Sequence, residues 1–156
     1  MKGFATGTVL VLLVSTLALA APPVTRVPMH SAGTATYYVQ GKIEGYGEIK
    51  LLVDTGSGYS AISEDTLDVL RGKGAATYLR ELNGIMADGS LRVVPVYLIS
   101  GINLGGKCMI RSVEVAVFPD DTRPILGLSA LKKVAPFVFS LDPPNLLLSR
   151  CNGGAA

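Results

Sequence analysis

An apolar run that ends at one acid and a glycine turn is the feature that most constrains this chain. Leu51, Leu52 and Val53 lead into Asp54, and Thr-Gly-Ser-Gly follows at residues 55–58. Three apolar residues before an acid are typical of the end of a buried strand, and glycine permits the tight turn after it. Burying a carboxylate is unfavourable unless it is hydrogen-bonded or shares a proton. Asp54 is therefore either a functional acid or a structural cap of the turn.

The rest of the chain predicts short strands separated by glycine-rich turns. A helix is expected to begin after an N-cap at Ser63 and to end at Gly72. Residues 124–131 predict a strand that runs into a second short helix through one glycine, and Pro95 predicts a sheet edge or a bulge. Strands are expected at residues 34–42, 48–53, 60–62, 77–82, 93–99, 102–104, 108–118, 137–141 and 146–149. This pattern predicts an all-β barrel or sandwich with one or two short helices.

The N-terminal residues predict export. Lys2, the apolar stretch at residues 9–14 and the small residues at 18–20 are typical of a signal peptide over residues 1–20, with an uncleaved membrane anchor as the alternative. Residues 21–33, with three prolines, predict a linker. A single domain is then expected over residues 34–151, with a tail at 152–156. We therefore expect an exported protein that contacts a membrane only if the leader is not cleaved.

Charge and histidine content exclude several classes of function. The chain has 14 Lys and Arg residues against 12 Asp and Glu residues, a balance that gives no electrostatic reason to bind nucleic acid. His30 is the single histidine and lies in a polar segment, where we expect it at the surface. A Ser-His-Asp or Cys-His site and a zinc site are thus disfavoured. We expect no metal and no cofactor.

Cys108 and Cys151 are the only two cysteines. In an oxidising compartment an even number of cysteines favours a disulfide. The alternative is two independent thiols.

Three motifs in the same order make the chain resemble the retroviral-type (retropepsin-like) aspartic proteases, especially their bacterial single-domain relatives. The first is Leu-Val-Asp-Thr-Gly at residues 52–56, which matches the active-site strand and loop. The second is Met-Ala-Asp-Gly at residues 86–89, where the family has its flap hairpin, and the third is Ile125-Leu126-Gly127 before a short helix. The resemblance covers roughly residues 34–150. Ser57 stands where the family commonly has Ala, although the two-domain pepsins also have Ser there.

The resemblance implies a closed acid-protease barrel, a periplasmic location and a role for each matching residue. Asp54 would be the catalytic acid and base, and the Thr55 hydroxyl would bond across a dimer axis. The Gly56 N–H would donate to the carboxylates, with Ser57 completing the loop. The flap, which would close over an extended peptide with apolar side chains, comprises Ala87, Asp88 and Gly89. The support beneath the loop comprises Ile125, Leu126 and Gly127.

The chemistry of paired acids agrees with this resemblance and predicts a homodimer. Peptide hydrolysis by carboxylates needs two acids within about 3 Å that share one proton. The chain has one Asp-Thr-Gly sequence and no second copy, so the second acid must come from a second chain. Two alternatives remain at this point. One is a non-catalytic dimeric peptide-binding module on the same fold, and the other is a monomeric structural or adhesion domain with a chance Asp-Thr-Gly.

Overall fold

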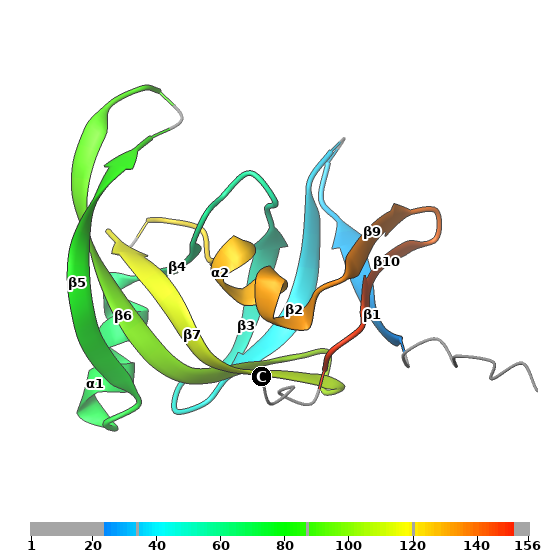
Figure 1. Cartoon of the computed structure of the whole chain (residues 1–156), viewed down its shortest axis with the longest axis horizontal. Helices are drawn as coiled ribbons and strands as arrows, with labels where there is room; N and C mark the ends of the chain where they lie inside the picture. The colour runs from blue at the N-terminus through cyan, green and yellow to red at the C-terminus, as the bar shows by residue number, and fades with distance from the viewer. Residues whose placement is uncertain (1–23, 34, 87, 120, 152–156) are drawn as a thin grey trace, which may run out of the picture.

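A computed structural model describes residues 24–33, 35–86, 88–119 and 121–151, and Figure 1 shows its arrangement. The strands of the described residues are β1 (Thr25–Ser31), β2 (Tyr37–Ile43), β3 (Gly47–Val53), β4 (Ser60–Ser63), β5 (Ala76–Ile85), β6 (Leu91–Leu104), β7 (Cys108–Phe118), β8 (Ile125–Leu126), β9 (Phe137–Leu141) and β10 (Pro144–Leu148). The helices are α1 (Glu64–Gly72), α2 (Leu128–Leu131) and the 3₁₀ turn η1 (Lys132–Val134). The expected all-β class with short helices is confirmed.

Six strands close into a barrel. The sheet order is β5-β6-β7-β4-β8-β3-β2-β1-β10-β9, and β6 also pairs with β2. This additional pairing joins Gly41 to Leu104 and Ile43 to Ile102, so the ring runs β6-β7-β4-β8-β3-β2 and back to β6. The interior is filled by fully buried aliphatic side chains, including Leu51, Ile99 and Leu126. The closed barrel therefore provides a rigid base for the loop that follows β3.

The N-terminal segment corrects one expectation. Residues 21–33 were expected to form a linker, but Thr25–Ser31 form β1, which pairs with β10 as far as Pro28 and with β2 from Met29 onward. Val27 and Met29 are buried while the residue between them is exposed. Pro28, which has no N–H to donate, thus lies where the strand changes partner. The alternation of apolar and polar residues over 26–30 was the signal, and the prolines obscured it. His30 is exposed, as expected.

The long strand β6 corrects a second expectation. Residues 93–99 and 102–104 were expected as two strands, but β6 runs unbroken from Leu91 to Leu104. It pairs with β5 in its first part and with β7 from Val96 onward. Pro95 lies just before the β7 pairing begins, where β6 has a partner on one side only, in agreement with the expected edge position.

Helix α1 begins after the capping residue that the sequence predicts. The Ser63 side chain accepts a hydrogen bond from the Thr66 N–H at 3.2 Å, and Glu64 and Asp65 occupy the first turn, where acids are favoured by the helix dipole. Helix α1 ends at Gly72, as expected, and lies at the opposite end of the β5–β6 hairpin from its tip (Figure 1). Helix α2 starts directly after Gly127.

A disulfide joins Cys108, at the start of β7, to Cys151, with 4.5 Å between the two Cα atoms. The structure thus has the bond that the cysteine pair predicts. In the described residues no helix is both long and apolar enough to cross a membrane. The expected signal peptide at residues 1–20 and the tail at 152–156 lie outside the described residues.

Candidate active site

Asp54 lies at the first position after β3, on a loop that is held at both ends. Its own N–H donates to the Leu126 carbonyl at 3.1 Å, which extends the β3–β8 pairing by one residue. The Gly56 N–H donates to Asp54 Oδ1 at 2.9 Å. Across the loop, the Leu128 N–H donates to the Ser57 carbonyl at 2.9 Å. One oxygen of the carboxylate is therefore held by the backbone of its own loop. The exposed Thr55 and Gly56 form the tip of this loop.

Gly127 explains how close the support lies to this loop. Strand β8 runs parallel to β3 and antiparallel to β4, so it fills the space between them. A Cβ at Gly127 would contact the Tyr59 carbonyl group and would lie 2.9 Å from the Ser60 nitrogen. The Gly127 N–H donates to Ser60 Oγ at 3.1 Å. Ile125, Leu126 and Gly127 thus lie directly beneath the loop, as the resemblance implies.

The residues expected to form the flap lie at the tip of the β5–β6 hairpin. Ile85 pairs with Leu91, and Gly89 has a φ of 81°, which glycine adopts without strain. Hydrogen bonding by Ser90 lowers the pKa of Asp88, and the Ser90 N–H donates to Asp88 Oδ1 at 2.9 Å. Asp88 therefore stabilises the turn as a carboxylate. Ala87, the third expected flap residue, lies outside the described residues.

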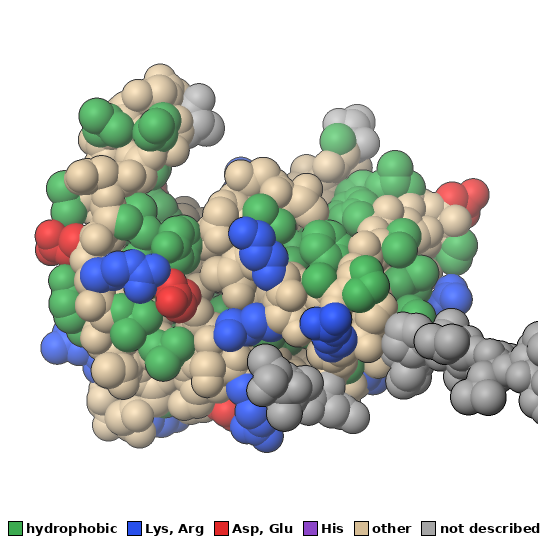
Figure 2. Space-filling model, in the orientation of Figure 1, with side chains coloured by type: hydrophobic (Ala, Val, Ile, Leu, Met, Phe, Trp, Pro, Cys, Tyr) green, Lys and Arg blue, Asp and Glu red, His purple; other side chains and the backbone are tan. Residues whose placement is uncertain are grey.

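An apolar cavity of about 360 Å³ separates the flap from the loop. Figure 2 shows the flap standing away from the body with a hollow beside it. Strands of the barrel and the flap line the cavity with apolar side chains, and the active-site loop contributes its glycines. The lining comprises Gly56, Ser57, Gly58, Tyr59, Ala61, Leu82, Gly84, Ile85, Met86, Val94, Ala116, Phe118 and Ile125. The sequence predicted the loop, the flap hairpin and β8 as parts of this site. It did not identify Leu82, Val94 and Phe118, because the residue pattern of a strand does not show which of its residues will line a cavity.

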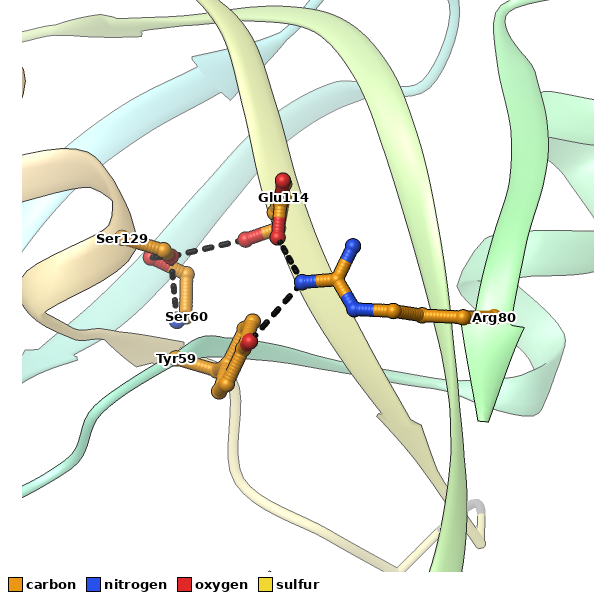
Figure 3. Close-up of polar contacts among 5 residues, drawn as sticks. All are labelled: Tyr59, Ser60, Arg80, Glu114 and Ser129. Atoms are coloured by element: carbon orange, nitrogen blue, oxygen red, sulfur yellow. Dashed lines mark hydrogen bonds and ion pairs between the residues drawn. The ribbon is translucent and has the colours of Figure 1, made fainter. Parts of the chain in front are cut away.

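The sequence also did not predict a polar cluster that lies beside the cavity. Arg80 Nη2 lies 2.6 Å from Glu114 Oε2 and donates to the Tyr59 hydroxyl at 2.9 Å (Figure 3). Glu114, and then Tyr59, raise the pKa of Arg80. Ser129 Oγ donates to the Glu114 carbonyl at 2.7 Å and accepts from the Ser60 N–H at 2.8 Å. These residues come from separate segments of the chain, and no spacing in the sequence relates them.

The described residues contain no cluster of potential metal ligands. Within the described ranges, no group of three or more His, Cys, Asp or Glu side chains is placed to hold a metal ion. Ser57 and Tyr59, the polar residues in the lining of the apolar cavity, both come from the loop after β3.

Comparisons with known proteins agree with this arrangement. Residues 39–133 match the protein-family model described as "gag-polyprotein putative aspartyl protease". Among solved structures, the fold is similar to a retropepsin-like aspartic protease from Rickettsia conorii, with a TM-score of 0.60 and 19% identity over 83% of this chain and 94% of that one. A comparison with curated proteins gave no match. The family match covers more than half of the chain and includes Asp54, the β5–β6 hairpin and β8. The chain therefore belongs to the retropepsin-like aspartic proteases.

Proposed function

We propose that the protein is an aspartic endopeptidase whose active site forms from two Asp54 carboxylates, one from each chain of a homodimer. The observation that carries this proposal is the position of Asp54. Its carboxylate is anchored by the Gly56 N–H at 2.9 Å on a loop that borders the apolar cavity beneath the flap. A structural cap would not require an adjoining cavity with a hairpin above it.

The chemistry follows from two acids that share one proton. The ionised Asp54 takes a proton from a water molecule as that water attacks the peptide carbonyl carbon, and the protonated Asp54 of the second chain donates to the carbonyl oxygen. The Gly56 N–H orients the carboxylate because it donates to one of the two carboxylate oxygens.

The proposed substrate is an extended polypeptide with an apolar side chain near the cleaved bond. The cavity that would receive this side chain is lined by Leu82, Val94, Phe118 and other apolar groups. An extended segment can pair with strand edges through its backbone while alternate side chains enter pockets. Closure of the β5–β6 flap would shield the reacting bond from bulk solvent.

Two surface features support a second copy of this chain as the partner. The Thr55 hydroxyl is at the exposed tip of the loop and has no hydrogen-bond partner among the described residues, so it is available to the partner's loop. Strand β9 pairs only with β10 in the described sheet, and its Val138 and Leu141 are 55% and 60% exposed. Apolar side chains on a free strand edge are typical of an interface.

Cleavage of a peptide library by the full chain, read by mass spectrometry from acid to neutral pH, tests the activity. The Asp54→Asn variant should abolish cuts next to apolar residues, because an amide cannot exchange the proton. The matched control is Asp68→Asn on α1, where the side chain is 76% exposed, and this variant should cut as the wild type does. Cleavage that survives Asp54→Asn would refute the proposal.

Mixing tests whether the site is shared. If subunits exchange freely, an equal mixture of wild type and Asp54→Asn should retain about one quarter of the activity of the same total amount of wild type, since only dimers with two acids are active. A monomeric enzyme would retain about half. A protein that dimerises and binds peptides without cutting them would instead be the non-catalytic module of the same fold.

Export is part of the proposal. The signal peptide predicted over residues 1–20 should be removed, leaving the chain in the periplasm or outside the cell. N-terminal sequencing of the protein from fractionated cells tests this, and a cell-associated chain that keeps its first residues would favour the membrane anchor.

A further inference from the structure

We propose that Arg80 is a positioning residue for the peptide site. It holds the Tyr59 side chain as the wall of the apolar cavity and so sets the size of side chain that the cavity accepts. The inference rests on the proposed function, because it assigns the selectivity of that same site.

The contacts of Arg80 join the flap to the active-site loop. In Figure 3 the guanidinium extends from β5 toward Tyr59 and Glu114. One nitrogen, Nη2, donates to both the Tyr59 hydroxyl and Glu114 Oε2, at 2.9 and 2.6 Å. The planar guanidinium has several donors in fixed directions, which a lysine ammonium does not have. Arg80 can therefore hold Tyr59 at a defined position relative to β7.

A bulge in β5 directs Arg80 toward these partners. The β5–β6 register shifts between Tyr78 and Arg80, which pair with Tyr97 and Val96, so Leu79 is the extra residue. A bulge changes the face to which the following side chain points, and bulges are common where a strand must re-aim a side chain. The irregularity in the flap strand thus coincides with the residue that contacts the active-site loop.

A hydrogen bond from Ser129 holds the Glu114 backbone in place. Ser129, in α2, donates to the Glu114 carbonyl at 2.7 Å and accepts from the Ser60 N–H at 2.8 Å. Glu114 is thereby tied to the residue that follows Tyr59 as well as to Arg80. The Tyr59 ring is held from its hydroxyl end by Arg80 and from its backbone by the Ser57 hydroxyl, which donates to the Tyr59 carbonyl at 2.6 Å.

Tyr59 lines two cavities. One is the apolar cavity beneath the flap, and the other is a more polar cavity of about 410 Å³ lined by Ser112, Lys132 and Lys133 among others. Gly58 and Tyr59 line both. Release of the Tyr59 hydroxyl would let the ring move between them, and the apolar cavity would then discriminate less between small and large side chains.

The test uses the full chain and two matched peptides that carry Val or Phe at the residue bound in the apolar cavity. Arg80→Lys keeps a cation for Glu114 but loses the planar Nη2 group whose N–H bonds are directed at both Glu114 and Tyr59, and Tyr59→Phe removes only the hydroxyl. Each variant should change the Val-to-Phe ratio of kcat/KM by about fivefold, the effect of one modest hydrogen bond. The change should appear in KM, while kcat stays within about twofold and the unfolding midpoint stays near that of the wild type.

The double variant decides whether Arg80 acts through Tyr59. If it does, Arg80→Lys combined with Tyr59→Phe should change the ratio no more than either single variant. Arg111→Lys is the matched control, since Arg111 also pairs with a glutamate on the barrel, Glu44, at 3.9 Å, and its ratio should equal that of the wild type. Additive effects in the double variant, or an unchanged ratio in both single variants, would overturn the proposal.

A binding measurement separates this inference from the proposed function. Calorimetry with Val and Phe peptides that carry a reduced-amide isostere at the cleaved bond reports selectivity without catalysis. If the wild type binds them but cuts no peptide, the endopeptidase proposal fails while the Arg80 comparison is still decided by the affinity ratio. If the wild type cuts library peptides but binds neither of these two, the Arg80 inference fails while the endopeptidase proposal stands.

Discussion

Gly127→Ala should destabilise the protein by about 2–4 kcal/mol. The added Cβ would lie 2.5 Å from the Tyr59 carbonyl carbon and 2.9 Å from the Ser60 nitrogen. Both are backbone atoms, so no side-chain rotation relieves the contact. Forcing an extra methyl group into a packed site costs about 1–3 kcal/mol, and loss of the Gly127 N–H bond to Ser60 Oγ adds about 1 kcal/mol. The backbone of Gly127 is extended, with φ of −102°, so steric contact rather than backbone strain is the cause.

Urea unfolding followed by circular dichroism measures this difference. For a chain of this size the loss corresponds to a fall in Tm of roughly 4–16 °C. Gly72→Ala is the matched control, because Gly72 ends α1 and an added Cβ there would meet no atom within 4 Å beyond its chain neighbours and the backbone of its own helix. Alanine there should be neutral or stabilise by up to about 1 kcal/mol. If Gly127→Ala unfolds within about 0.5 kcal/mol of the wild type, the close approach of β8 to the active-site loop is refuted.

Three further predictions concern the disulfide, the flap and the first helix. Replacing Cys108 and Cys151 by serine should cost about 4 kcal/mol in the chain-entropy model for a separation of 43 residues; equal urea midpoints for the variant and the oxidised wild type would contradict it. The pKa of Asp88 is lowered from 3.8, so its stabilisation of the flap turn is present above that pH and is lost as the pH falls through the lowered value. The Ser90 amide signal in NMR should shift below pH 3.8, and Asp88→Asn should remove that step; a step above pH 4 would argue against the hydrogen bond. Ser63→Ala should cost about 1 kcal/mol through loss of the N-cap, and an unchanged unfolding midpoint would show that α1 does not depend on it.

Local chemistry determined the elements whose information lies within a few residues. Asp54 after an apolar strand, the N-cap at Ser63 and the Asp-Gly hairpin at residues 88–89 each combine a residue preference with a neighbouring pattern. The structure has an element of the expected kind at each of them. The sequence alone also predicted the all-β class, because strand patterns and glycine turns recur along its whole length.

Only the tertiary structure decided which of these elements meet. The pairing of β6 with β2 that closes the barrel joins segments about 60 residues apart, and the burial of Val27 and Met29 turned an apparent linker into β1. The contact between Arg80, Tyr59 and Glu114 likewise depends on a bulge and on the neighbouring strand β7. Such contacts depend on packing between residues that are far apart in the sequence. The closed barrel determines which side chains meet, and the preferences of neighbouring residues do not determine these partners.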